Sequence, residues 1–247
     1  MKFALFLLSL VYLESSSLIL DCLFDQELLF DDLKVSYTCN VEHLQTNETK
    51  RNVSEINGRH QWSKTHEDVT QLYIQNQNME YFPIGFTTFF ENIVAVHAGM
   101  NKLKYLEKYD LKGFKKMRYL YLYSNLLETL QSDVFEYSSV LEYVSFYNNR
   151  LMHIGAKILL PLKRLKSAYF NKNICIDKMA TSEQVMSELR LEIAEKCSDI
   201  TDEDLMDTLK FNQMKIINLE EKVDQISEQL ANVMEALKGI RSDNNTV

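Results

Sequence analysis

The chain contains few residues of the kinds that break or cross-link a fold. Its 247 residues include 6 glycines, 2 prolines and 4 cysteines, so it does not have the composition of a collagen-like or low-complexity chain. Apolar residues make up 46% and charged residues 25%, which is enough to bury a core and does not match a disordered protein. We therefore expect one or two globular domains.

Long hydrophobic runs are also rare, and the one that stands out lies at the start. Residues 1–17 combine a basic Lys2, an apolar run from Phe3 to Leu13 and small residues up to Ser17, the pattern of a secretory signal peptide. We predict cleavage near Ser17 and a secreted, extracellular protein. The alternatives are a short buried helix or a membrane anchor, but about eleven apolar residues are too few to span a bilayer, which needs about twenty.

Later in the sequence, no segment is apolar enough to predict a membrane span, and the polar residues 238–247 do not resemble a lipid-anchor signal. The net charge of the chain is −8. From Thr181 onwards there are 15 acidic and 7 basic residues, a difference of −8, so the preceding 180 residues sum to zero. No basic segment is concentrated enough to predict binding to nucleic acid or to an anionic membrane.

Enzyme motifs are missing from the sequence as well. There is no G-x-S-x-G, phosphate-binding loop or H-E-x-x-H pattern. The histidines have no metal-ligand spacing: His43, His60, His66, His97 and His153. The adjacent carboxylates Asp31 and Asp32 are interpreted as surface charge. We expect a protein that is not an enzyme and that has no metal or other cofactor.

What the sequence does contain is a repeat of 24 residues. Its five units start at Val69, Ile93, Met117, Leu141 and Leu165. Three positions into the units lie Leu72, Val96, Leu120, Val144 and Ala168. Eight positions in lie the amides Gln77, Asn101, Asn125, Asn149 and Asn173. This pattern, L-x-x-L-x-L-x-x-N-x-L, is that of a leucine-rich repeat. Five units in phase argue against the alternative, an ordinary α/β or helical domain in which leucines recur by chance.

The repeat predicts a fold. Alternating apolar residues at positions three and five indicate a short strand that buries one face and stacks in parallel on the next unit. The amide at position eight lies where the chain leaves the sheet, and it is suited to bond backbone groups that the turn leaves unpaired. Because one unit cannot bury its own apolar face, stacking is obligatory and both ends need caps. We predict an α/β repeat fold, a short leucine-rich repeat solenoid over residues 69–174.

The cysteines flank the repeats and indicate the two caps. Cys22 and Cys39 fall in an amino-terminal cap, residues 18–68, and Cys175 and Cys197 in a carboxy-terminal cap, residues 175–198. Three pairings are possible. We favour Cys22 with Cys39 and Cys175 with Cys197, because each closes a short loop; such a bridge contributes about 3 kcal/mol.

A helix is predicted within the carboxy-terminal cap. Thr181 and Gln184 have capping-box spacing, and Val185, Leu189 and Ile193 share one helical face that would cover the last unit. If the protein is secreted, three sequons become candidates for glycosylation: Asn47, Asn52 and Asn244.

The tail has a different period from the repeats. Apolar residues alternate by steps of four and three through residues 201–241, which predicts a long coiled-coil helix and a partner helix. The seam consists of Leu205, Leu209, Asn212, Ile216, Leu219, Val223, Ile226, Leu230, Val233, Leu237 and Ile240. We expect a homodimer or heterodimer; the alternative is that the helix folds back on the solenoid. Residues 242–247 are expected to be disordered.

The outward strand positions would form a concave surface, which repeat proteins commonly use for binding. Seven of the thirteen tyrosines fall on its fifteen positions, whereas the second unit contributes only small residues beside one histidine. The predicted binding residues are Tyr73, His97, Tyr119, Tyr121, Tyr123, Tyr143, Tyr147 and Tyr169. Exposed tyrosines provide large contact area at low entropic cost, which favours binding of an extracellular protein or glycan. The alternative is that tyrosine suits a strand surface and stacks on its neighbours.

Taken together, these motifs resemble those of secreted leucine-rich repeat proteins of mosquitoes and midges. The resemblance rests on the signal peptide, the YTCNV segment at Cys39, the NKNICIDK segment at Cys175, the repeats and the coiled coil, and it covers nearly the whole mature chain. The nearest analogy is to mosquito leucine-rich immune proteins. It implies extracellular innate immunity and coiled-coil dimers that carry complement-like factors in haemolymph. This chain has fewer repeats, and no cysteine remains for an interchain bridge once both caps close.

The leading hypothesis is a secreted, non-enzymatic binding protein with a tyrosine-rich concave face. The alternative is a structural or salivary secreted protein in which the repeats only support assembly through the tail.

Overall fold

The computed structural model describes residues 17–29, 34–198, 223, 225–227 and 229–230. The chain divides into two compact units, Met1–Asp199 and Ile200–Val247. The predictions for residues 1–16, Asp31, Asp32, Asn244 and residues 242–247, and for every seam residue except Val223, Ile226 and Leu230, lie outside the described residues.

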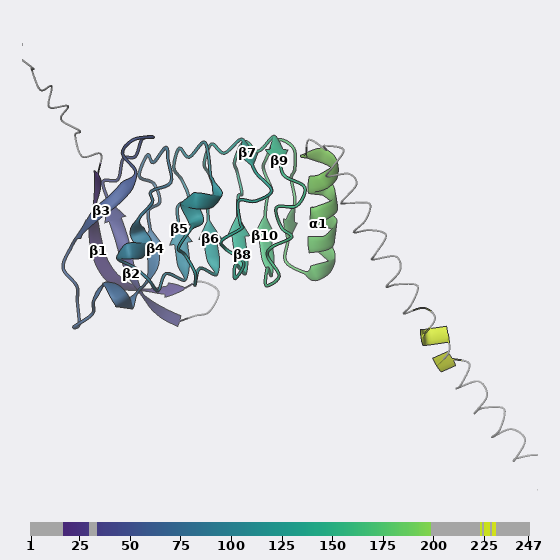
Figure 1. Cartoon of the computed structure of the whole chain (residues 1–247), viewed down its shortest axis with the longest axis horizontal. Helices are drawn as coiled ribbons and strands as arrows, with labels where there is room; N and C mark the ends of the chain where they lie inside the picture. Colours follow the sequence, from purple (N-terminus) through teal and green to yellow (C-terminus); the bar gives the residue numbers. More distant parts are fainter. Residues whose placement is uncertain (1–16, 30–33, 199–222, 224, 228, 231–247) are drawn as a thin grey trace, which may run out of the picture. The chain divides into compact units, whose positions relative to one another are not determined.

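Five parallel strands, one from each 24-residue unit, form the middle of the first compact unit (Figure 1). They are β4 (Val69–Tyr73), β5 (Ala95–His97), β6 (Tyr119–Tyr121), β8 (Tyr143–Ser145) and β10 (Ser167–Tyr169). Equivalent residues lie side by side: Leu72, Val96, Leu120, Val144 and Ala168 are in register. The constant period therefore becomes a row in space, and the chain forms a solenoid of leucine-rich-repeat type.

The return paths of the units contain no α-helix among the described residues. They contain the 3₁₀ helices η2 (Phe86–Thr88) and η3 (Lys108–Leu111) and the strands β7 (Thr129–Leu130) and β9 (His153–Ile154), which pair in parallel. The predicted repeat fold is present as a parallel, strand-rich solenoid whose described return paths are short 3₁₀ helices and strands. A 24-residue unit leaves room there for a single tight turn, and 3₁₀ geometry occurs in such short pieces.

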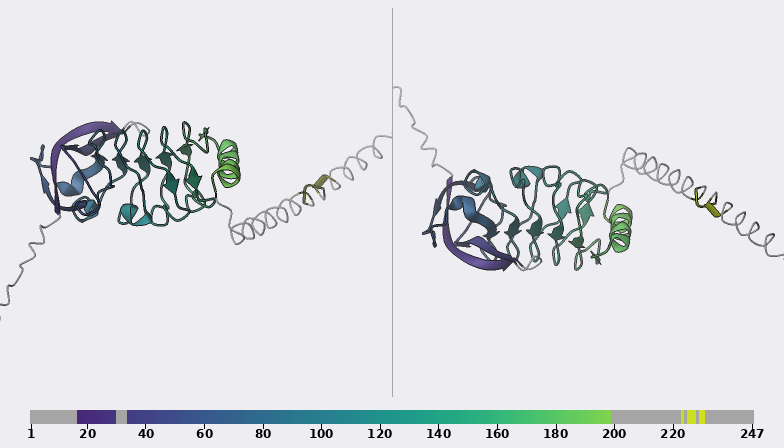
Figure 2. Two further views of the ribbon diagram at one scale, coloured as in Figure 1. Left: turned by 90° about the horizontal axis from the view of Figure 1, so that it is seen from above. Right: turned by 90° about the horizontal axis from the view of Figure 1, so that it is seen from below.

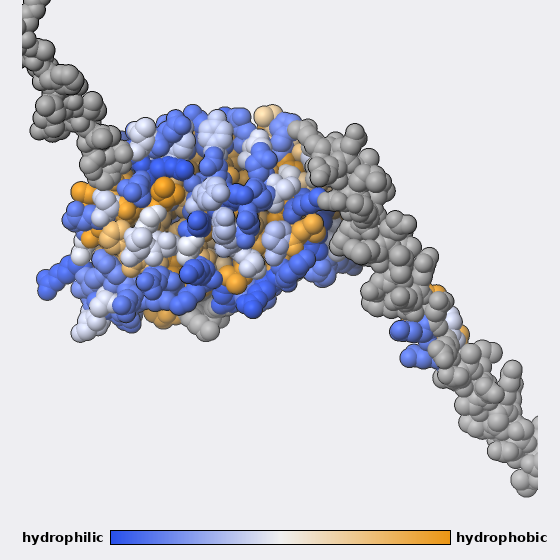
Figure 3. Space-filling view, viewed as in Figure 1, coloured by the Kyte–Doolittle hydropathy of each residue, from blue (hydrophilic) through white to orange (hydrophobic). Residues whose placement is uncertain are grey.

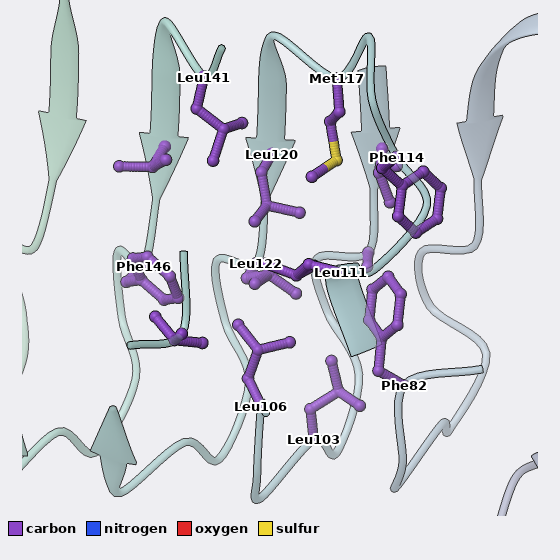
Figure 4. Packing of buried hydrophobic residues seen from close by; sticks show 14 of the residues in the cluster. Phe82, Leu103, Leu106, Leu111, Phe114, Met117, Leu120, Leu122, Leu141 and Phe146 are labelled. Atoms are coloured by element: carbon purple, nitrogen blue, oxygen red, sulfur yellow. The ribbon is translucent and has the colours of Figure 1, made fainter. Parts of the chain in front are cut away.

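The core runs through the interior of the solenoid. Figure 4 shows labelled side chains of four successive units, from Phe82 in the first to Phe146 in the fourth, pointing into one shared space. Leu106 and Phe114 from the return path are buried against the same core as the strand residues Leu120 and Leu122. Each fully buried side chain of this size contributes about 1.5–3 kcal/mol. The apolar residues are turned inward, and the face in Figure 3 is largely hydrophilic with scattered apolar residues.

The repeated asparagines form a ladder of hydrogen bonds along the turn. Asn125 Nδ2 donates to Leu122 O within its own unit (3.0 Å) and to Ala98 O of the preceding unit (3.0 Å). Asn125 Oδ1 accepts from Leu103 N (3.1 Å). Asn101, Asn149 and Asn173 make the same three kinds of bond. The predicted structural role of the amide is confirmed. In the first unit, Gln77 Oε1 instead accepts from Leu44 N of the cap (3.0 Å).

The amino-terminal cap continues the sheet with three strands, β1 (Ser17–Leu29), β2 (Lys34–Glu42) and β3 (Asn52–Asn57). β2 pairs in parallel with β4, antiparallel β1 follows, and β3 forms the edge. Figure 2 shows β1 curving around this end of the solenoid. The predicted disulfide between Cys22 and Cys39 joins β1 to β2. The short helix η1 (His66–Asp68) then leads into the first unit.

The carboxy-terminal cap is a helix, α1 (Glu183–Lys196), preceded by the short strand β11 (Met179–Ala180), which pairs antiparallel with β10. Leu189 and Ile193 are buried, as predicted, and the predicted disulfide between Cys175 and Cys197 is present. The predicted cap is wrong by one residue: Ser182, and not Thr181, accepts the bond from Val185 N. β11 was not predicted, because two residues are too few for a periodic signal.

One backbone position in every unit has an unusual conformation. The residue seven positions into each unit has a positive φ, between 53° and 58°: Asn76, Met100, Ser124, Asn148 and Lys172. Asparagine tolerates this left-handed region because its short polar side chain bonds locally, whereas most other residues are strained there. Repetition of the turn thus imposes left-handed backbone on a methionine, a serine and a lysine.

We predict that Met100→Asn stabilises the protein by about 1 kcal/mol, since strain at such a position costs on the order of 1–3 kcal/mol. Met100 is 52% exposed, so the substitution removes little packing. In thermal unfolding followed by circular dichroism, the midpoint should rise by about 2–4 °C. Met152, also exposed but outside the positive-φ set, is the control: an equal rise for Met152→Asn would contradict the strain argument.

Candidate functional site

All eight residues predicted for the concave face lie on the strands of the repeats or two residues after them. Six are half-buried: Tyr73, Tyr121, Tyr123, Tyr143, Tyr147 and Tyr169. The other two, His97 and Tyr119, are only 5% and 3% exposed. The expectation of exposed aromatics is therefore wrong for these two residues, which support the face and do not form its surface.

The rings form one continuous row of contacts across the repeats, the aromatic ladder, made of Tyr73, His97, Tyr121, Tyr143 and Tyr169. The first three rings are stacked, whereas the planes of Tyr121 and Tyr143 are tilted by 40° and those of Tyr143 and Tyr169 by 34°. His97 lies between Tyr73 and Tyr121, with ring centroids 3.9 and 4.5 Å away and planes within 9° of parallel. Parallel strands bring equivalent side chains to about 4.8 Å from one another, which is close to the separation that stacked aromatic rings prefer. The repeat spacing itself therefore produces the ladder.

The ladder continues through the fourth unit although that unit has a serine at the ring position. Ser145 occupies the place that corresponds to Tyr121 and Tyr169, and it is buried. Tyr143, two residues earlier, fills the gap with ring centroids 4.8 Å from Tyr121 and 5.1 Å from Tyr169. In the fourth unit, the ring of Tyr143 thus takes the place that Tyr121 and Tyr169 fill in their own units, and the small Ser145 leaves room for it.

The small residues of the second unit accommodate tyrosines of the third. A Cβ atom on Gly99 would lie 2.6 Å from two ring atoms of Tyr123, so only glycine permits this approach. Tyr123 extends across Gly99 and donates a hydrogen bond to Gln75 Oε1 of the first unit (3.0 Å). In the same way, Ala95 packs against Tyr119. The second unit therefore provides the surface on which its neighbour's rings rest.

Burial controls the protonation of the histidine in the ladder. Desolvation lowers the pKa of His97 from 6.5 to about 3, so the ring is neutral at physiological pH. Its Nε2 atom lies 3.2 Å from Gln71 Oε1, also buried. A neutral imidazole stacks between two phenol rings without carrying a charge into the buried layer. His97 thus has a structural role. Its ring stays neutral down to about pH 4, so it does not change the charge of the face above that pH.

At the other end of the face, a lysine adds positive charge beside the tyrosines. Lys172 Nζ lies 5.1 Å from the ring centroid of Tyr147, within the range of a cation–π interaction. Hydrogen bonding to Tyr147 raises the pKa of Lys172. The half-buried part of the face in units three to five therefore combines aromatic rings, hydroxyl groups and one cation.

The site has the properties of a binding surface made of rigid side chains. Each ring is held by its neighbours, so little side-chain entropy remains to be lost on binding. Among the described residues, no three His, Cys, Asp or Glu side chains are grouped as a metal site. No helix in the described part of the chain is long and apolar enough to cross a membrane. The supporting roles of Gln75, Gly99 and Ser145 were missed, because nothing in the sequence marks which ring of another unit will contact each of them.

No family model matches the chain, and comparison with curated proteins finds no match. Among solved structures, the chain is similar to one in the "Structure of the Toll - Spatzle complex, a molecular hub in Drosophila development and innate immunity". The two are 17% identical with a TM-score of 0.42. The similarity covers 51% of this chain and 18% of the other, so it spans less than two thirds of that protein's length.

The buried His97 predicts a loss of stability in mild acid. Below its unfolded pKa of 6.5, the unfolded chain binds a proton that the folded protein rejects until about pH 3, so the free energy of unfolding falls with pH in this window. His97→Phe keeps an aromatic ring but cannot titrate. In urea denaturation, the wild type should lose about 2 kcal/mol more than His97→Phe between pH 7 and pH 5. Parallel pH profiles would show that His97 is protonated in the folded protein.

Proposed function

We propose that this protein is a secreted, non-enzymatic binding protein whose concave face recognises an extracellular protein. The observation that carries the proposal is the aromatic ladder: half-buried tyrosines, held by contacts with neighbouring rings and arranged in a row on the sheet. Tyrosine provides contact area and a hydroxyl group with few rotatable bonds, and aromatic residues are enriched among the residues that dominate binding energy. The two disulfides, one in each cap, are typical of an oxidising compartment and support secretion.

The accessible part of the face indicates where the partner would bind. In the second unit all three outward residues, Ala95, His97 and Gly99, are buried, whereas units three, four and five are consecutive and each keep at least two outward residues half-exposed. The proposed contact surface is therefore the carboxy-terminal three units of the array. A role in innate immunity is supported by the resemblance of the cap and repeat motifs to mosquito leucine-rich immune proteins.

The second candidate function is that of a scaffold that assembles through its tail. It is favoured by the stacking itself, because rings that satisfy one another need no ligand. In both proposals the tail forms a coiled coil, homodimeric or heterodimeric. The tail residues that the structure describes are helical, and Val223, Ile226 and Leu230 are each 60–63% exposed at seam spacing. Apolar side chains exposed at seam spacing favour a partner helix.

The two functions are distinguished by Tyr121→Ala/Tyr147→Ala, which removes two half-buried rings from units three and four. Tyr105→Ala/Tyr109→Ala is the matched control, because these tyrosines are 59% and 57% exposed outside the concave face. We expect a protein captured from extracellular fluid, identified by mass spectrometry, to be lost with the concave variant and kept with the control. Loss of two such contacts should weaken its affinity at least about 30-fold, or about 2 kcal/mol. Unchanged capture by a folded concave variant would favour the scaffold.

For the tail, we predict that Ile226→Lys converts a dimer into a monomer, because it places a charge in the apolar seam. Sedimentation velocity of the full chain measures the change. Gln225→Lys adds the same charge one residue away, outside the seam, and should leave the dimer intact. A dimer that persists in Ile226→Lys would place self-association elsewhere in the molecule.

A further inference from the structure

Basic side chains lie along the side of the sheet at which the strands of units three to five begin. Arg118, Glu142 and Lys166 each directly precede β6, β8 or β10. Glu142 N donates to Arg118 O (2.8 Å), and Lys166 N donates to Glu142 O (2.8 Å). These backbone bonds place the three residues in one row, about 4.8 Å apart from strand to strand.

The one carboxylate in this row is already neutralised. Glu142 Oε1 lies 2.6 Å from Arg118 Nε, and Glu142 Oε2 lies 2.6 Å from Lys166 Nζ. Hydrogen bonds from Arg118 and Lys166 lower the pKa of Glu142 to about 2, against the opposing effect of burial. Two cations therefore share one anion, and the row keeps a net positive charge.

Further cations flank the row without a carboxylate partner. Lys115, Lys163 and Arg164 are exposed, and in the described part of the chain they take part in no ion pair. Lys116 bonds to the neutral side chain of Asn92. We name this set the basic edge: Lys115, Lys116, Arg118, Lys163, Arg164 and Lys166. With Glu142 included, its formal charge is +5.

The basic edge comes from two short basic runs that are far apart in the sequence, residues 115–118 and 163–166. Lys115 and Lys163 are 48 residues apart, but they occupy the same position in units two and four. Two strand spacings, about 10 Å, separate such positions in the solenoid. The fold therefore collects short, scattered basic groups into a narrow line on a protein whose net charge is −8.

A line of cations on an edge is suited to a linear polyanion. The two disulfides indicate an oxidising compartment, where nucleic acid is not the expected polyanion. The anionic surface potential of a membrane belongs to its cytoplasmic leaflet, and a narrow edge is a poor match to a flat surface. Sulfated polysaccharide chains are polyanions of the extracellular space that are both linear and regularly charged.

We propose that the basic edge binds linear sulfated polysaccharides. The surface differs from the concave face, so the proposal rests on the secretion proposed above but not on binding at the concave face. Binding would be electrostatic, with counterions released from the polyanion for each cation engaged. It would allow the protein to be held at cell surfaces or matrix while the concave face remains available.

Heparin is the probe, tested with the full-length mature protein on an affinity column and by titration at several salt concentrations. The edge variant is Lys115→Gln/Lys163→Gln/Arg164→Gln. Its control is Lys50→Gln/Lys102→Gln/Arg150→Gln, which removes the same charge from exposed residues away from the edge. We expect retention of the wild type and of the control. The edge variant should elute at lower salt, and the slope of log Kd against log salt should fall by about three.

A third variant, Glu142→Gln, provides a test in the opposite direction. It removes the carboxylate from the row, so it should elute from heparin at higher salt than the wild type. Equal weakening of the edge and control variants would overturn the proposal, because net charge alone would then explain binding. No retention of the wild type at low salt would also overturn it. Binding to desulfated heparin, single-stranded DNA or phosphatidylserine vesicles as tight as to heparin would contradict sulfated polysaccharide as the ligand.

Discussion

The structure depends on one constraint, which is that each 24-residue unit is placed on the previous one with the same turn. The asparagine ladder enforces it, because every amide bonds both its own turn and the unit before it. A slip of one residue would leave several buried backbone groups without partners, at about 1–3 kcal/mol each. The core, the row of strands and both surfaces inherit their order from this registration. The left-handed backbone at Met100 and Lys172 is accepted for the same reason.

Identical placement has a second consequence on the outward face. Rings carried at equivalent positions arrive at stacking distance, and the ladder from Tyr73 to Tyr169 results. The units are not identical in sequence, and a missing or small side chain at one position is matched by a ring from another position. Tyr143 replaces a ring where Ser145 has none, and Gly99 leaves room for Tyr123. The concave face is therefore a single rigid structure in which removal of one ring affects its neighbours.

The same row of strands organises charge at its edge. Arg118, Glu142 and Lys166 are 24 residues apart in sequence and adjacent in space. In a solenoid, position within the unit decides which surface a residue occupies, and unit number decides how far along it lies. A weakly charged repeat array on an acidic chain can thus present a concentrated basic line. The concave and edge surfaces are separate, so two ligands of different chemistry could bind at once.

The sequence alone determined the period, the solenoid and the structural role of Asn101, Asn125 and Asn149, because each depends on local pattern or on exact repetition; among three possible pairings of the cysteines it favoured the two disulfides that form. It did not determine the 3₁₀ return paths, the cap at Ser182 or strand β11, since short elements carry too little periodic signal. Only the tertiary structure decided that His97 and Tyr119 are buried and that Tyr143 crosses to the position of Ser145. These outcomes depend on how side chains from different units fill common space, which no single stretch of sequence encodes.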